Sequence, residues 1–189
     1  MKIGLYFGSF NPIHTGHCII AQHVLNNSPL DQVWFVVSPQ NPLKSTASLL
    51  NEYHRLHLVR LAIEGETNLK TSDIEFHLPR PSYTIDTLTY LKEKYPLLDF
   101  AVIMGSDSLQ NIKKWKNHEL LLTLYEVYIY KRPGWEVDNI SHPNIKIVNA
   151  PLLQISSTHI RENIRKKQSI RYLVPDKVME EIERYGYYK

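Results

Sequence analysis

Two histidines, His14 and His17, lie three residues apart in the segment GSFNPIHTGH, residues 8–17. Side chains of this type can bind a metal ion, cap a turn, or donate hydrogen bonds to an anion. A zinc site on a helix favours His at i and i+4 with a third ligand, whereas here only the thiol of Cys18 is near. The anion-facing alternative is favoured because both residues fall at the expected start of a helix, where unpaired N–H groups attract negative charge. The other two alternatives stay open.

Donors that face a phosphate suit nucleotidyl transfer. An acceptor that is itself a phosphate is already ionised, so the protein must align two anions and neutralise their charge without a catalytic base. Donors aimed at a five-coordinate phosphorus contribute on the order of 10²–10³ each in rate, by analogy with other oxyanion donors. The chain has neither a dinucleotide fingerprint nor a P-loop. Instead, Gly8 offers a position without a Cβ where a phosphate can approach, and Gly16 permits close packing.

Short apolar runs alternate with helix-length amphipathic segments, which is typical of βαβ units and a parallel sheet. The pattern predicts strands over residues 2–7, 32–37, 70–76, 99–105, 126–131 and 145–149. It predicts helices over 15–27, 49–64, 82–96, 157–167 and 175–185, with helical turns around 106–124. The expected fold class is α/β, a Rossmann-like, doubly wound, mainly parallel sheet with helices on both faces and a small C-terminal helical part. Ligands are expected where the strand order reverses.

The composition fits one domain over residues 1–189, with 43% hydrophobic residues. No signal-peptide pattern and no membrane-length apolar run is present, and the single cysteine cannot form an internal disulfide, so we expect a cytoplasmic protein with no membrane partner. The net charge of +3 suits small anionic substrates and is too mild to imply nucleic acid. The basic segment 161–171 is expected to be a solvated helix face. A homo-oligomer stays open.

The segment GSFNPIHTGH resembles the G-x-F-x-P-x-H-x-G-H signature of the nucleotidyltransferase superfamily, and ISSTHIR (155–161) resembles its second motif. Other segments are similar, in order and over almost the whole chain, to the bacterial nicotinate-nucleotide adenylyltransferase family: SYTIDTL (82–88), MGSDSL (104–109), KRPG (131–134) and YLVPDKVMEEI (172–182). The resemblance implies transfer of the adenylyl group of ATP to nicotinate mononucleotide. The implied products are deamido-NAD (nicotinate adenine dinucleotide) and pyrophosphate, with Mg²⁺ as the cofactor bound to ATP, in NAD biosynthesis.

Site roles follow from the same resemblance. It implies catalytic roles for His14, His17 and Arg161. It implies ATP binding by Gly8, Ser9, Phe10, Gly105, Asp107, Ile155, Ser156, Ser157 and Thr158. Lys44 and Arg132 are the expected phosphate contacts, and Tyr83, Thr84 and Trp115 the expected contacts of the nicotinate nucleotide. No side-chain metal ligands are expected, because Mg²⁺ is held mainly by phosphate oxygens and water.

The residues themselves support several of these roles. Ser156 or Ser157 can cap a helix that points at phosphate, and the same helix end carries Arg161. Thr84 begins a helix, so its backbone N–H can donate to a carboxylate, which favours nicotinate over nicotinamide. Trp115 can stack on the pyridine ring or pack in the core. Asp107 can bind a ribose hydroxyl or cap a helix.

The chain departs from the family pattern at three positions. Phe7 stands where a second glycine is usual, Asn11 where Asp is frequent, and Leu43 where a histidine is usual. Two other functions remain as alternatives: an adenylyltransferase of the same fold with a nicotinamide mononucleotide or phosphopantetheine acceptor, and a non-catalytic module that binds a nucleotide or RNA.

Overall fold

A computed structural model of the chain describes residues 1–40, 48–135, 137, 142–151 and 153–189. Within these residues the strands are β1 (Lys2–Gly8), β2 (Gln32–Val37), β3 (Leu69–Ser72), β4 (Asp99–Gly105), β5 (Val127–Tyr130) and β6 (Ile145–Val148). The helices are α1 (Thr15–Asn26), α2 (Glu52–Ala62), α3 (Thr84–Lys94), α4 (Ser106–Gln110), α5 (His118–Leu124), α6 (Ser157–Arg165) and α7 (Asp176–Tyr185). Two 3₁₀ turns, η1 (Ile74–His77) and η2 (Ile112–Lys114), complete the set. None of these described helices is long and apolar enough to cross a membrane.

The strands form one parallel sheet with the order β3-β2-β1-β4-β5-β6. The chain builds the sheet outward from β1 to β3 and then returns to add β4 on the other side of β1. The strand order therefore reverses between β1 and β4, as the predicted doubly wound fold requires. At such a reversal the loops after the two strands diverge to opposite faces and leave a crevice for a ligand.

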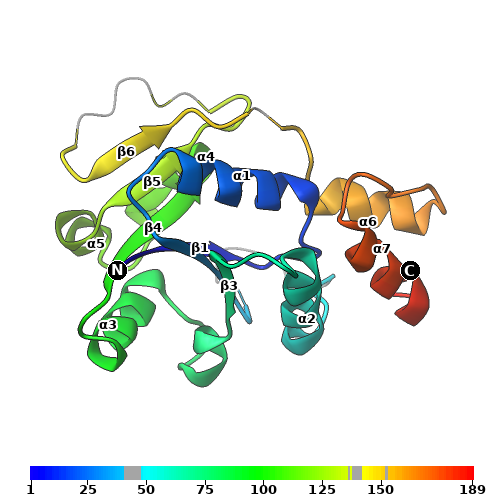
Figure 1. Cartoon of the computed structure of the whole chain (residues 1–189), viewed down its shortest axis with the longest axis horizontal. Coiled ribbons are helices and arrows are strands. Elements are labelled where there is room, and N and C mark those ends of the chain that lie inside the picture. Colours follow the sequence, from blue (N-terminus) through cyan, green and yellow to red (C-terminus); the bar gives the residue numbers. More distant parts are fainter. Residues whose placement is uncertain (41–47, 136, 138–141, 152) are drawn as a thin grey trace.

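Side chains along each strand alternate between two cores, one on each face of the sheet. In β4, for example, Ala101 and Ile103 enter the first core while Val102 and Met104 enter the second. The first core receives Val24 of α1, Val59 of α2, Ile160 of α6 and Val178 of α7, and the second receives Leu88 of α3, Leu109 of α4 and Leu121 of α5. Burial on both faces explains why the central strands are continuously apolar. Figure 1 shows α6 and α7 together at one end of the molecule, beside α2.

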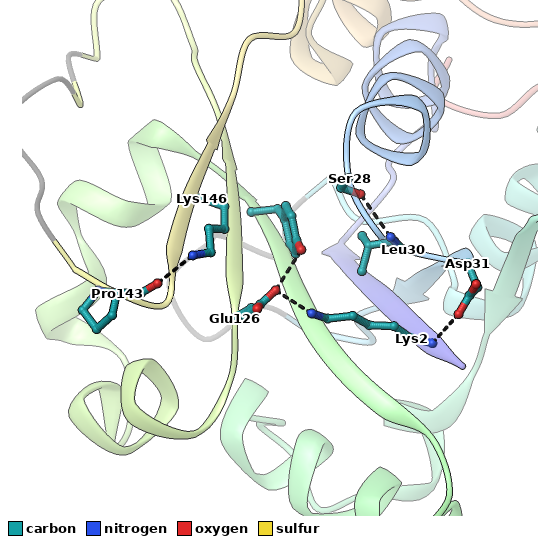
Figure 2. Close-up of polar contacts among 8 residues, drawn as sticks. Lys2, Ser28, Leu30, Asp31, Glu126, Pro143 and Lys146 are labelled. Atoms are coloured by element: carbon teal, nitrogen blue, oxygen red, sulfur yellow. Dashed lines mark hydrogen bonds and ion pairs between the residues drawn. The ribbon is translucent and has the colours of Figure 1, made fainter.

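The amino end of β1 is fixed by Lys2 (Figure 2). Its backbone N–H donates to Asp31, just before β2, over 2.6 Å, and its Nζ pairs with Glu126, just before β5, also over 2.6 Å. The Lys2 and Glu126 side chains are partly exposed, so this ion pair contributes at most about 1 kcal/mol. These contacts lie at the amino ends of the strands. The crevice lies at the carboxyl ends.

Three local predictions are corrected by the structure. The strand predicted over 70–76 ends at Ser72, because the Ser72 hydroxyl accepts from the N–H of Ile74 and the chain turns into η1. The helix predicted from residue 49 begins at Glu52, since Asn51 caps it by accepting from the N–H of Tyr53. The helix predicted from residue 82 begins at Thr84, and the hydroxyl of Ser82 donates to Glu75 over 2.8 Å instead of capping this helix.

Candidate active site

A cavity of about 960 Å³ lies at the carboxyl ends of β1 and β4, where the strand order reverses. Gly8 ends β1 and Gly105 ends β4, and both line it. The cavity brings together residues that the sequence spreads from position 6 to position 161. Of the predicted site residues, it is lined by Gly8, Ser9, Phe10, His14, His17, Tyr83, Thr84, Gly105, Asp107, Trp115, Arg132, Ser156, Ser157, Thr158 and Arg161.

The two histidines lie at the start of α1, with His14 as the residue before its first turn and His17 in that turn. Their rings stack with centroids 3.6 Å apart and planes inclined by 22°. The backbone N–H of His14 donates to Nδ1 of His17 over 3.2 Å. An accepting Nδ1 leaves the proton of a neutral His17 ring on Nε2, which makes that nitrogen a donor.

His14 is buried, with 6% of its surface exposed. Burial, assisted by the positive charge of Arg132, lowers the pKa of His14 to about 4. The ring is therefore neutral at neutral pH and carries one N–H donor. Its Nδ1 has no hydrogen-bond partner among the described residues. A neutral donor fits the anion-facing interpretation, because it needs no proton transfer to act.

The expectation that a phosphate approaches the missing Cβ of Gly8 is wrong, because the ring of Phe10 fills that space. A Cβ at Gly8 would lie 2.7 Å from Cζ of Phe10. The Phe10 ring also packs edge-on against Tyr6 and His17, with centroids 5.8 and 5.1 Å away. Gly8 is thus required by aromatic packing beneath the histidines, while its own backbone still borders the cavity.

The second motif holds the first motif in place. Ser156 caps α6 by accepting from the N–H of His159 over 3.2 Å. The Ser157 hydroxyl donates to the Pro12 carbonyl over 2.8 Å, and Nη1 of Arg161 donates to the Asn11 carbonyl over 2.7 Å. The cap falls on Ser156, and Ser157 instead ties the two motifs together. Arg161 lines the cavity at the end of α6 where positive dipole charge adds to its own.

Arg132 and Asp107 face each other at the end of β4. Nη1 of Arg132 pairs with Oδ2 of Asp107 over 2.9 Å, and both side chains are partly exposed in the cavity. The cap alternative for Asp107 fails, since Gly105 occupies the capping position of α4 and no side chain caps it. Oδ1 of Asp107 is buried and has no hydrogen-bond partner in the described part of the chain. It is an acceptor available to a ligand hydroxyl.

The other end of the cavity is formed by the start of α3 and by Trp115. Thr84 is the first residue of α3 and Tyr83 precedes it, so unpaired N–H groups of the helix end border the cavity. Trp115 is partly buried, packs against the second core and also lines the cavity. The core-packing interpretation of Trp115 is confirmed, and its stacking on a pyridine ring stays a prediction. Lys116 places its ammonium 5.1 Å from the centre of the Tyr83 ring and pairs with Asp86, which adds a cation at this end.

One predicted site residue is not found at the cavity, and another lies outside the described residues. Ile155 is not among its described lining residues; it packs on the first core, near Gly16. Lys44, with its neighbour Leu43, lies outside the described residues.

Sequence reasoning also missed residues that the structure brings to the site. Tyr6 and Tyr130 line the cavity and share a hydrogen bond of 3.1 Å between their hydroxyls. Because both tyrosines lie in strands, their sequence positions look like those of ordinary core aromatic residues. Glu75, 2% exposed, lies at the cavity and accepts from Ser82 and Thr87. The signal that could have found Glu75 is its position as an acid between the apolar residues Ile74 and Phe76.

The described residues contain no group of three or more His, Cys, Asp and Glu side chains placed to hold a metal ion. The i, i+3 histidines stack on each other, and the backbone N–H of His14 donates to Nδ1 of His17. The described lining of the cavity combines the side chains of His14, Arg132 and Arg161 with the carboxylates of Glu75 and Asp107.

Comparison with known proteins gives one consistent result. Residues 5–163 match the model of the cytidylyltransferase-like family. A probable nicotinate-nucleotide adenylyltransferase of Flavobacterium psychrophilum is 53% identical over 100% of both chains, and one of Cytophaga hutchinsonii is 50% identical over 100% of this chain and 98% of the other. The solved Plasmodium falciparum nicotinic acid mononucleotide adenylyltransferase, in complex with NaAD, superposes with a TM-score of 0.85 at 25% identity, over 99% of this chain and 97% of that one. This chain is an enzyme of the nicotinate-nucleotide adenylyltransferase family.

Proposed function

We propose that the cavity binds ATP and nicotinate mononucleotide together and transfers the adenylyl group between them. The observation that carries this proposal is the polarity of the cavity. One end holds His14, His17 and Arg161, and the other holds the start of α3 beside Trp115. Donors and a cation at one end suit a triphosphate, while a helix N-terminus beside an aromatic ring suits a pyridine carboxylate.

In this reaction a phosphate oxygen of the mononucleotide attacks the α-phosphorus of ATP. A new P–O bond forms, the bond between the α-phosphorus and the bridging oxygen breaks, and pyrophosphate leaves with that oxygen. The attacking phosphate is already ionised, so no residue needs to remove a proton. The protein contributes alignment and charge stabilisation, and neutral His14 is suited to that work.

The donors at the triphosphate end have separate tasks. His17 donates from Nε2 to the phosphate that carries the developing charge, with His14 stacked against it, and Arg161 supplies a full positive charge. Ser156, Ser157 and Thr158 present the amino end of α6 to the same phosphates. Gly8, Ser9, Phe10 and Gly105 border the nucleotide, the free oxygen of Asp107 accepts from a ribose hydroxyl, and Arg132 adds a cation beside it.

The acceptor end selects the nicotinate carboxylate. The N–H of Thr84 and the helix dipole of α3 attract a negative group, and an uncharged nicotinamide gains less from them. Trp115 stacks on the pyridine ring, with Tyr83 beside it. Lys116 lies over the Tyr83 ring and pairs with Asp86, so its charge is largely compensated there.

Magnesium enters this proposal as part of the substrate MgATP. The described residues offer no carboxylate cluster for a resident ion, which fits an ion held by triphosphate oxygens and water. When bound, it neutralises phosphate charge. The use of ATP and a single cysteine, Cys18, which cannot form a disulfide within one chain, support a cytoplasmic location.

Pyrophosphate release from MgATP tests the proposal, with nicotinate mononucleotide, nicotinamide mononucleotide and phosphopantetheine offered separately. Turnover with nicotinate mononucleotide well above that with the other two is expected. Preference for phosphopantetheine would keep the chemistry and reject the substrate. No turnover with any acceptor, together with retained ATP binding, would favour a non-catalytic module.

A further inference from the structure

Arg55 of α2 is an arginine buried at 0% exposure behind the wall of the cavity. It does not itself line the cavity in the described chain. Its neighbours Leu56, Leu58 and Val59 are buried apolar side chains of the core. Burial of a charged group in such surroundings is costly unless the group is fully hydrogen-bonded. The position of Arg55 therefore requires an explanation beyond packing.

Among the described residues, the guanidinium of Arg55 makes four hydrogen bonds, each to a main-chain carbonyl. Nε donates to Leu50 over 2.8 Å, Nη1 to Ser9 over 2.5 Å and to Ser38 over 2.8 Å, and Nη2 to Pro39 over 2.9 Å. The planar fork of arginine can serve several acceptors in fixed directions, which lysine cannot.

These four carbonyls belong to the two loops that border the triphosphate end. Ser9 lies in the loop between β1 and α1, and the other three lie between β2 and α2, before and after the segment 41–47, which is outside the described residues. Ser9 and Ser38 line the cavity. A carbonyl oxygen carries negative partial charge and repels a phosphate. Since these oxygens bond to Arg55 behind the wall, they point away from the anion site.

Asn11 extends the same network from the first loop. Its Nδ2 donates to the Ser48 carbonyl over 2.8 Å and its Oδ1 accepts from the N–H of Leu50 over 3.1 Å. An aspartate could accept from Leu50 but could not donate to Ser48, so asparagine makes a two-point link that the acid cannot. The carbonyl of Asn11 meanwhile receives Arg161. The two loops and the second motif thus form one hydrogen-bonded unit.

The charge of Arg55 is not balanced by a bonded carboxylate that the structure records. Glu52, the acid nearest in sequence, pairs with Arg80 over 2.7 Å. Burial lowers the pKa of Arg55 to about 10, which still leaves the guanidinium charged at neutral pH. A buried positive charge behind the wall adds attraction for a triphosphate, since low dielectric surroundings screen it weakly.

We propose that Arg55 is a positioning residue for ATP: it turns four loop carbonyls away from the phosphate site and adds positive charge behind it. This proposal rests on the proposed function only for the identity of the ligand. Arg55 touches neither substrate, so its effect should fall on the affinity and alignment of the triphosphate and not on the mononucleotide.

The test compares Arg55→Lys and Arg55→Met with the matched control Arg60→Lys, an exposed arginine on the same helix. Binding of a non-hydrolysable ATP analogue and of nicotinate mononucleotide is measured separately by calorimetry, and the melting temperature and KM values are measured alongside. Arg55→Lys should weaken analogue binding at least about tenfold, since charged hydrogen bonds are lost, and leave mononucleotide binding within about twofold. Arg60→Lys should match the wild type.

A lower melting temperature with unchanged analogue binding would overturn the proposal, because it would show a structural role alone. Equal weakening of both ligands would also overturn it. If Arg55→Met does not fold, Asn11→Ala tests the same network from the other loop and should likewise weaken the analogue selectively. The binding readout needs no turnover, so an inactive wild type would reject the proposed reaction while leaving this comparison intact.

Discussion

Arg161 in α6 donates from Nη1 to the main-chain carbonyl of Asn11 over 2.7 Å, across 150 positions of the sequence. The bond joins the two signature motifs directly. It holds the guanidinium at the cavity and fixes the loop that leads into His14 and His17. Its Nη2 donates to Thr158 over 3.3 Å, within the second motif itself.

Replacement of Arg161 should therefore reduce catalysis more than stability. Arg161→Met is expected to lower kcat/KM about 100-fold or more, because it removes a charge from the triphosphate and releases the Asn11 loop. Arg161→Lys should lose less of its kcat/KM than Arg161→Met, because lysine keeps the positive charge but lacks the planar guanidinium with its several donors. Steady-state kinetics with both substrates provide the measurement. Arg165→Met, at an exposed position on the same helix, is the control, and a similar loss in that variant would contradict a specific role for Arg161.

His17→Ala should leave folding intact and lower the chemical step at least about 100-fold, since it removes an aligned donor. Single-turnover kinetics with saturating MgATP measure that step apart from product release. Circular dichroism should show an unchanged fold, because His17 lies at a helix start and not in a strand core. Wild-type turnover in a folded His17→Ala protein would reject the donor role.

Stability should depend on pH through His14. Its pKa is near 4 in the folded protein and near 6.5 when unfolded, so between these values the unfolded state binds more protons. Stability is therefore highest above pH 6.5 and falls as the pH drops toward 4, by about 2 kcal/mol between pH 7 and pH 5 from this residue alone. Urea unfolding of the wild type and of His14→Asn at both values isolates the contribution. The same pH dependence in both proteins would contradict a buried, neutral His14.

Trp115→Ala should raise the KM for nicotinate mononucleotide about tenfold, as expected for loss of one aromatic stacking contact. A smaller loss of stability is expected too, because Trp115 also packs against the second core. Trp115→Phe should keep a KM for nicotinate mononucleotide and a stability close to those of the wild type, since phenylalanine retains an aromatic ring. If the KM for ATP changes while that for the mononucleotide does not, the stacking role is wrong.

Much of the fold is determined locally, and those parts were predictable. The alternation of apolar runs with amphipathic segments indicated all six strands of the described sheet, because burial on both faces demands continuous apolar residues in β1, β2 and β4. Errors came where a side chain competes with the regular backbone pattern. Ser72 ended its strand early, and Ser82 gave its hydroxyl to Glu75 instead of capping α3.

The sequence by itself determined the two motifs, the helix starts at residues 15 and 157, and the class of chemistry, since these depend on residue types at short spacing. Only the tertiary structure decided what each residue touches. In the structure the Phe10 ring fills the space beside Gly8, and Arg132 pairs with Asp107. Arg55 bonds to the carbonyls of Ser9 and Ser38, which lie in the loops after β1 and β2. Such contacts join positions far apart in the chain, and no local spacing encodes them. They exist because β1 and β4 lie side by side, which brings the loops after both strands to one cavity.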